Sequence, residues 1–69
     1  MNRSNSIIEP QNKLNLSISE AAAYSGIGMH TLRRLIEQED CDFVLHVGNK
    51  KKLIKRAKFE KYLSAHEYI

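Results

Sequence analysis

The sequence predicts a small α+β domain with three helices and a short three-stranded antiparallel sheet. Three observations support this prediction: two helix-forming segments joined by a glycine-containing turn, a strand–turn–strand pattern after them, and a third amphipathic segment towards the end. A chain of 69 residues forms one domain at most. Its hydrophobic fraction of 42% and charged fraction of 28% are ordinary for a globular protein, so we expect one packed core.

Residues 14–66 are expected to form the folded domain, between a flexible arm of residues 1–13 and a tail of residues 67–69. The arm is rich in Asn and Ser and contains the only proline, Pro10, a composition that favours loops. Leu14-Asn15-Leu16 alternates apolar and polar side chains, which predicts a short strand. We expect this strand to pair with a hairpin that comes later in the chain.

A first helix is predicted to begin at Ile18. Ser17 and Glu20 have the spacing of a capping box, in which each side chain accepts a hydrogen bond from the backbone amide of the other residue. The helix continues through Ala21-Ala22-Ala23, and Gly26 supplies the left-handed residue that ends it. The small alanines permit a second helix to approach closely.

A second helix is predicted from Met29 to about Glu39, after a turn in which Ile27 points inward and Gly28 is the N-cap. One face of this helix is apolar and the opposite face is polar. The apolar face consists of Met29, Leu32, Leu35 and Ile36, and the polar face of His30, Arg34, Glu37 and Gln38, with Thr31 and Arg33 on its shoulders. Two helices joined in this way predict a helix-turn-helix from Ser17 to Gln38.

A β-hairpin is predicted after the second helix. Phe43, Leu45 and Val47 occupy alternate positions, which is typical of a half-buried strand. Gly48-Asn49 predicts a turn, and a return strand ends in Leu53-Ile54. Because these last two apolar residues are adjacent, the sequence leaves open which one faces the core.

A third helix is predicted from Arg56 to about His66, because Phe59, Tyr62 and Leu63 form an apolar stripe at helical spacing. A helix-turn-helix followed by a hairpin and a final helix is the arrangement of a winged helix-turn-helix, in which the hairpin is the wing. We therefore expect a small winged helix-turn-helix monomer.

Positive charge is concentrated late in the chain. The net charge is +3 and the pI is about 9.2, an excess that suits nucleic acid, an acidic partner or solubility alone. Between Lys50 and Lys61, however, seven basic residues stand against the single acid Glu60. The field of this segment should be positive and sensitive to salt.

The combination of helix-turn-helix, adjacent arginines and basic hairpin indicates DNA binding. A plain helical hairpin would explain the alanines and leucines but neither basic feature. Arg33 and Arg34 are candidates for phosphate or guanine contacts; alternatively, they lie on a solvated face where Arg33 pairs with Glu37. The lysines at the hairpin tip suit phosphate or minor-groove contact, or else they discourage edge-to-edge aggregation.

Ten residues form the candidate DNA-binding set. Arg34 lies nearest the centre of the polar helix face and is the better candidate for base contact, while His30 and Thr31 occupy the first turn, which usually meets base edges. The set comprises His30, Thr31, Arg33, Arg34 and Gln38 from the helix and Asn49, Lys50, Lys51, Lys52 and Lys55 from the hairpin.

No catalytic, metal or cofactor site is expected, and we do not expect an enzyme. Cys41 is the only cysteine, so neither an internal disulfide nor a cysteine-based zinc site can form within one chain. The histidines His30, His46 and His66 lie on separate predicted elements and lack the spacing of metal ligands. We see no signal-like N-terminus and no membrane-length apolar stretch. The expectation is a cytoplasmic protein without a membrane or small-molecule partner.

A family resemblance adds to these observations. The segment from Leu16 to Gly28, followed by Thr31-Leu32-Arg33-Arg34-Leu35-Ile36, resembles the opening of excisionases from conjugative transposons, relatives of the MerR-like winged-helix group. The segments Phe43-Val44-Leu45, Val47-Gly48-Asn49-Lys50 and Leu53 to Glu60 resemble their wing and final helix. The first half is shared with many small winged-helix proteins, whereas the Ile-Lys-Arg-x-x-Phe-Glu ending is more specific.

The resemblance implies a bacterial accessory factor of a tyrosine recombinase. Such proteins bind double-stranded DNA near the ends of a mobile element, bend it, and help the integrase to excise the element. By the family pattern, the helix from Met29 to Gln38 enters the major groove, and the wing around Lys50 to Lys52 lies along the backbone or minor groove.

Two other functions stay open at this point. A small transcriptional regulator would use the same fold, and an integrase gene beside this one would favour excision instead. A protein-interaction module that presents its basic helix to an acidic partner would not shift duplex DNA in a gel at moderate salt.

Overall fold

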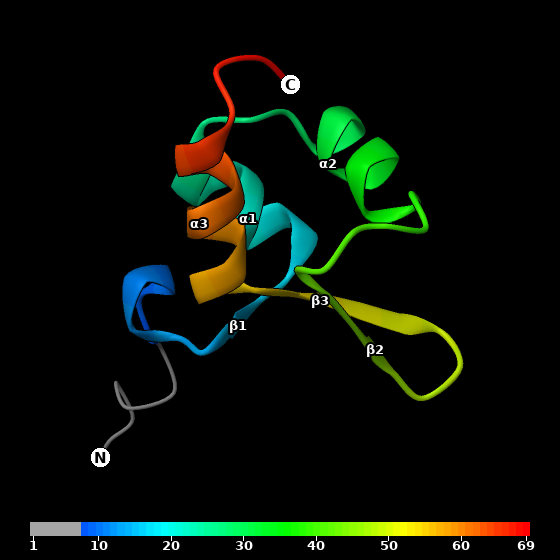
Figure 1. Ribbon diagram of the computed structural model, residues 1–69. Coiled ribbons are helices and arrows are strands. Elements are labelled where there is room, and N and C mark those ends of the chain that lie inside the picture. Colours follow the sequence, from blue (N-terminus) through cyan, green and yellow to red (C-terminus); the bar gives the residue numbers. More distant parts are fainter. Residues whose placement is uncertain (1–7) are drawn as a thin grey trace.

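The computed structural model describes residues 8–69 and confirms the predicted fold, with three helices and one three-stranded antiparallel sheet. The elements are the 3₁₀ helix η2 (Pro10–Asn12), β1 (Asn15–Leu16), α1 (Ile18–Ser25), α2 (Met29–Ile36), β2 (Val44–Val47), β3 (Lys51–Lys55) and α3 (Arg56–Ala65). The three helices lie together, and the β2–β3 hairpin projects away from them (Figure 1). The predicted arm lies partly in residues 1–7, outside the described residues.

The start and end of α1 follow from local hydrogen bonds, as the sequence predicted. Ser17 Oγ accepts from the Glu20 amide at 3.1 Å, and Glu20 Oε1 accepts from the Ser17 amide at 2.9 Å, which completes the capping box. At the other end, Gly26 has a φ of 79°, and its amide donates to the Ala22 carbonyl at 2.9 Å. The turn to α2 is therefore short, and the half-buried Ile27 packs against the core.

The second helix is shorter than predicted and ends at Ile36. The next residue, Glu37, is the C-cap, and the Gln38 amide donates to Leu35 at 3.2 Å in a turn. Three of the four residues from 37 to 40 are acidic, and negative charge at the C-terminus of a helix opposes the helix dipole. The prediction that the helix continues to about Glu39 was therefore wrong, and Gln38 lies beyond the helix.

The sheet has the order β1-β3-β2, so the strand before α1 pairs with the hairpin as predicted. Ile54 stands opposite Leu16 on one side and Val44 on the other. Ile54 and Leu16 are fully buried, whereas Leu53 is half-buried and faces away. The register left open by the sequence is thereby settled, with Ile54 facing the core.

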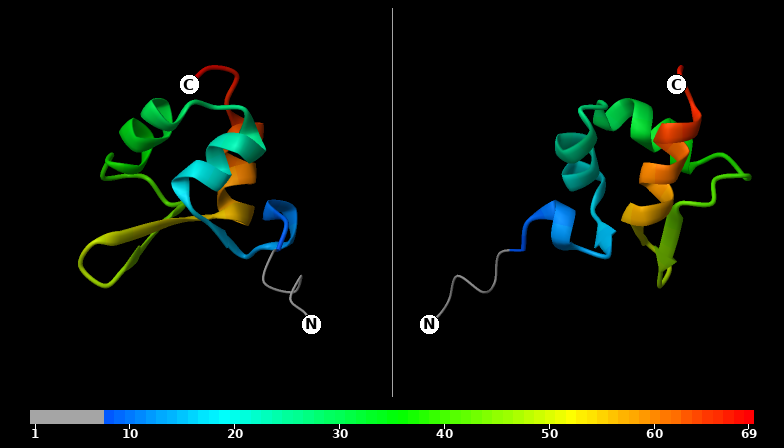
Figure 2. Two further views of the ribbon diagram at one scale, coloured as in Figure 1. Left: turned by 180° about the vertical axis from the view of Figure 1, so that it is seen from behind. Right: turned by 60° about the vertical axis from the view of Figure 1, so that its left-hand side comes forward.

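The burial pattern expected for the first strand of the hairpin was wrong. The chain bends at Phe43, and β2 begins only at Val44, so that both residues contact the core. Leu45 then lies on the opposite face of the sheet, and Val47 is 42% exposed. The left view of Figure 2 shows the physical reason: the outer half of the hairpin extends past the helices.

Eight buried apolar side chains form the core and come from β1, β3, the three α-helices and the loop before β2; β2 contributes the flanking Val44. They are Leu16, Ala21, Leu32, Leu35, Ile36, Phe43, Ile54 and Phe59. The rings of Phe43 and Phe59 are 5.3 Å apart, which joins the base of the hairpin to α3. Each fully buried Phe, Leu or Ile contributes roughly 1.5–3 kcal/mol, so a core this small leaves little stability to lose. Met29, predicted on the buried face of α2, is only half-buried.

The two glycines of the helix-turn-helix provide a matched test of the turn. Gly26 has a left-handed φ of 79°, whereas Gly28 has a φ of −63° that any residue adopts. A Cβ atom at either position meets no other atom within 4 Å, so only backbone strain separates the two substitutions. We expect Gly26→Ala to lower the free energy of unfolding by about 1–2 kcal/mol, and Gly28→Ala to change it much less. Equal losses in urea unfolding would contradict this account of the turn.

Candidate nucleic-acid interface

The exposed face of α2 carries the first group of candidate residues. His30, Arg33 and Arg34 are exposed, and Thr31 is half-buried at the edge of the same face. The helix starts without a side-chain cap at Gly28, so its first amide groups are free to face an anion. This arrangement provides two arginines and the positive end of the helix dipole on one accessible element.

Within residues 8–69, no ion pair neutralises the arginines of α2. Within residues 8–69 the only two ion pairs join Lys13 to Glu20 and Arg56 to Glu60. Arg33 therefore does not form the pair with Glu37 that was considered together with the solvated-face interpretation. Arg34 Nη2 donates only a long hydrogen bond of 3.5 Å, to the carbonyl of Ile69.

An acidic turn follows α2 directly. Glu37, Glu39, Asp40 and Asp42 are all exposed. Carboxylates in this position repel phosphate, so they disfavour an approach of DNA to the C-terminal end of α2. The positively charged part of the helix is thus its first two turns, and Gln38 lies in the acidic turn rather than on the helix.

The wing divides its basic residues between two faces. The register pairs His46 with Lys52 and Val47 with Lys51, and directly opposed residues point to the same side of a sheet. Because Ile54 faces the core, Lys52 and His46 lie on the helix side of the hairpin, and Lys51 lies on the outer side. Asn49 and Lys50 are exposed at the tip, beside Gly48 with its left-handed φ of 65°.

From the sequence, His30 was considered as a DNA contact but His46 was left out of the candidate set, because His46 has no metal-ligand spacing and a structural or solvated role was expected for it. The sequence carried no sufficient signal for it, because it left the register open, and only the register makes His46 the cross-strand neighbour of Lys52. His46 is exposed and lies on the same face of the wing as Lys52.

Lys55 lies apart from the rest of the candidate set. It stands at the base of β3, opposite Asn15, and lines a shallow pocket with Leu14, Leu45, Ala57 and Lys58. The structure brings Asn49, Lys50 and Lys52 together at the wing tip but places Lys55 on the outer face near the start of α3.

A polar network holds the helices in place and uses one of the basic residues. Arg56 Nε donates to the Lys13 carbonyl at 2.7 Å, and Arg56 Nη1 donates to Glu60 at 3.2 Å. The Tyr24 hydroxyl also donates to Glu60, and the Lys13 ammonium donates to Glu20. The network joins the segment between η2 and β1 to α1 and α3, so Arg56 is committed to the fold and not to a ligand.

These hydrogen bonds shift three pKa values. The Lys13 ammonium lowers the pKa of Glu20 below 4.5, and the Tyr24 hydroxyl lowers the pKa of Glu60. The same contact raises the pKa of Tyr24 above 10.0, because Glu60 accepts its proton in a hydrogen bond. All three groups are solvent-accessible, so the shifts describe local pairing and not a catalytic centre.

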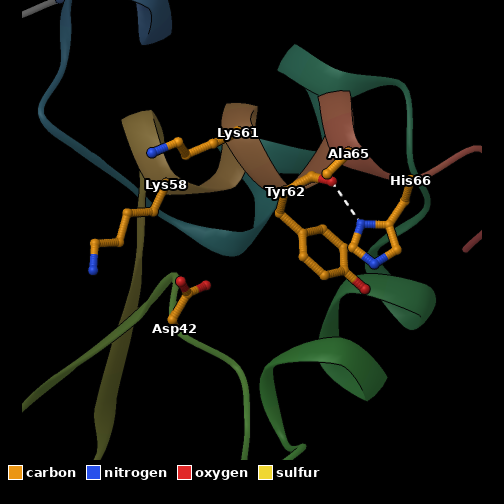
Figure 3. A pocket seen from close by; sticks show the side chains of 6 residues that line it. All are labelled: Asp42, Lys58, Lys61, Tyr62, Ala65 and His66. Atoms are coloured by element: carbon orange, nitrogen blue, oxygen red, sulfur yellow. Dashed lines mark hydrogen bonds between the residues drawn. The ribbon is translucent and has the colours of Figure 1, made fainter.

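A second shallow pocket lies between α3 and the loop before β2 (Figure 3). The rings of Tyr62 and His66 stack with centroids 4.1 Å apart, and His66 Nδ1 donates to the Tyr62 carbonyl at 2.8 Å. Asp42, Lys58 and Lys61 surround the same pocket, but no ion pair joins them. Across residues 8–69, no three His, Cys, Asp or Glu side chains cluster as metal ligands do.

A family model described as "Excisionase from transposon Tn916" matches residues 1–68. The chain belongs to this excisionase family. Comparisons with curated proteins and with solved structures found no match. Excisionases are DNA-binding accessory factors of transposon excision, and their family works with an integrase. The chain is therefore an excision-related DNA-binding factor with a winged-helix fold, as the sequence predicted. Between residues 8 and 69 the excisionase has no helix that is long and apolar enough to cross a membrane.

The stability of the excisionase should depend on pH through its polar network. The lowered pKa values of Glu20 and Glu60 contribute stability above pH 4.5, which is lost as the pH falls through their folded-state values. The raised pKa of Tyr24 contributes stability below pH 10.0, which is lost as the pH rises. Glu60→Gln and Tyr24→Phe should each flatten both limbs of a plot of urea midpoint against pH. A profile unchanged in both variants would show that the network does not stabilise the fold.

Proposed function

We propose that the excisionase binds double-stranded DNA near the ends of its element through residues 14–66, bends it, and assists a tyrosine recombinase in excision. One observation supports this most directly. The arginines of α2, which form no ion pair within residues 8–69, and the helix-side wing residues Lys52 and His46 occur together in a chain of the excisionase family. The two elements are the parts of a winged helix that reach DNA.

The first two turns of α2 are proposed to lie in the major groove. The acidic turn after the helix keeps its C-terminal end away from phosphate, so His30, Thr31 and Arg33 face the groove edge and Arg34 lies at the centre of the exposed face. Arginine recognises guanine through two parallel hydrogen bonds to O6 and N7. Arg34 is therefore proposed to read a base, and Arg33 to contact either base or phosphate.

The wing tip is proposed to contact the backbone or the minor groove beside this site. Asn49, Lys50 and Lys52 are exposed there, and each ammonium group that reaches a phosphate releases condensed counterions without recognising a base. Gln38 and Lys51 are proposed only as peripheral contacts, and Lys55 is left out of the proposed DNA interface because it lies on the outer face of the sheet.

Two contacts in neighbouring grooves supply the physical reason for bending. A straight duplex meets α2 first, and curvature towards the hairpin adds the phosphate contacts of the wing. Smooth bending of a short site costs about 1–6 kcal/mol, which additional charge-assisted contacts offset. A bent end would place the sites of the recombinase closer together.

Arg34→Ala tests base recognition. The variant should weaken binding to the cognate site by about 1–3 kcal/mol and weaken binding to random duplex much less, because a base contact is lost. Fluorescence anisotropy with both duplexes measures the difference, and Lys61→Ala on α3 is the matched control for lost charge. Equal losses on the two duplexes would show that Arg34 contacts phosphate instead.

Lys52→Ala and Lys51→Ala test the orientation of the wing with the same chemical change on adjacent residues. Lys52 lies on the helix side, so its loss should weaken all duplexes and reduce the slope of log K against log salt by about 1. Lys51 lies on the outer side and should change the slope much less. The reverse order would mean that the hairpin meets DNA with its other face.

The proposed function as a whole is tested by excision. Footprinting locates the site at the element ends, gel mobility of circularly permuted fragments measures the bend, and a reconstituted reaction with the recombinase measures the excised product. We expect protection near the ends, a bend, and product only when the excisionase is added. Protection without an effect on excision would favour a transcriptional regulator, and no shift of duplex DNA at moderate salt would favour a protein-interaction module.

A further inference from the structure

The outer face of the sheet carries a surface that the DNA-binding elements do not use. Six residues, from Leu14 just before β1, from the three strands and from the start of α3, line a shallow pocket there. We call this surface the outer patch. It consists of Leu14, Asn15, Leu45, Lys55, Ala57 and Lys58. Leu45 and Lys55 belong to the face of the sheet opposite Ile54, so the outer patch lies on the side away from the core.

The centre of the outer patch is apolar and unusually open. Leu14 is 79% exposed, and the half-buried Leu45 and exposed Ala57 line the same pocket. One exposed leucine is ordinary, but an apolar cluster in a concave surface marks a binding site more often. The apolar cluster of the outer patch is therefore available for contact with another molecule.

The border of the outer patch is positively charged. Lys55 and Lys58 line the pocket and no acidic residue does, and neither lysine takes part in an ion pair within residues 8–69. Lys58 also lines the neighbouring pocket with Asp42 (Figure 3), but no ion pair joins the two residues. An occupant of the outer patch therefore needs negative charge as well as an apolar side chain.

A protein segment satisfies these needs better than DNA. Protein interfaces combine an apolar centre with a polar rim, whereas phosphate binding makes no use of Leu14 and Leu45. The outer patch also lies on the face of the sheet opposite His46 and Lys52. A duplex held by α2 and the helix side of the wing would leave it accessible.

We propose that the outer patch binds an acidic, amphipathic segment of the recombinase that assembles on the same DNA. An apolar side chain of the segment packs between Leu14, Leu45 and Ala57, and its carboxylates pair with Lys55 and Lys58. This inference rests on the proposed function, because it assumes that a recombinase joins the excisionase at the element ends. It assigns DNA and recombinase to opposite faces of the hairpin.

The test uses Leu14→Ser and Lys58→Glu, with Lys61→Glu as the matched control. Lys61 is exposed on the same helix but does not line the outer patch, so it controls for the change in net charge. Leu14 is largely exposed, so Leu14→Ser should keep the melting temperature of the parent. Recruitment of the purified recombinase is measured by sedimentation, with the element-end duplex and again without DNA, beside binding of each variant to the duplex alone.

We expect Leu14→Ser and Lys58→Glu to weaken recruitment about tenfold or more, as for an anchor of an interface. Lys61→Glu should change recruitment little, and Leu14→Ser should bind the duplex as the parent does. Full recruitment by Leu14→Ser would overturn the inference. Loss of duplex binding in Leu14→Ser would assign the outer patch to DNA. If the parent is a dimer and Leu14→Ser dissociates it, the outer patch binds a second copy of the chain. Either result would also overturn the inference. Failure of the parent to bind the duplex would count against the proposed function alone, because the titration without DNA still tests the outer patch.

Discussion

The register of β3 at Ile54 is the constraint on which the rest of the structure depends. Ile54 stands opposite both Leu16 and Val44 and is fully buried, so the three strands meet at one side chain in the core. Because side chains alternate along a strand, this single position fixes the direction of every other residue of the hairpin. A slip of one residue would exchange the two faces, and would move Lys52 and His46 to the outer side.

This register divides the positive charge of the chain into parts with different roles. The sequence shows one basic segment from Lys50 to Lys61, but the fold separates it into a wing tip, a structural arginine and a group beside the outer patch. Arg56 serves the network that joins α1 to α3. Lys55 and Lys58 border an apolar pocket. A net charge counted along the sequence therefore overstates the charge available to DNA at the wing.

Local signals in the sequence sufficed to predict much of the fold. The capping box, the glycine that ends α1 and the alternating pattern before α1 can each be recognised within a few consecutive residues. The end of α2 was misjudged because apolar spacing was weighed above three acids at a helix C-terminus. The burial of β2 was misjudged because alternation predicts that a strand has two faces but does not show whether other elements cover either face. Phe43 is buried because the chain bends there, and Val47 is exposed because the hairpin extends past the helices. The arginines of α2 were visible from spacing alone, whereas His46 and the separate place of Lys55 required the register.

The central claim is that DNA contacts α2 and the helix side of the hairpin while the outer face stays free. Amide chemical shifts in ¹H–¹⁵N spectra, recorded during titration with the element-end duplex, test it most directly. The claim predicts large changes at residues 29–36 and around Lys50 and Lys52, and small changes at Leu14, Leu45 and Ala57. Large changes centred on the outer patch, with α2 unaffected, would contradict it.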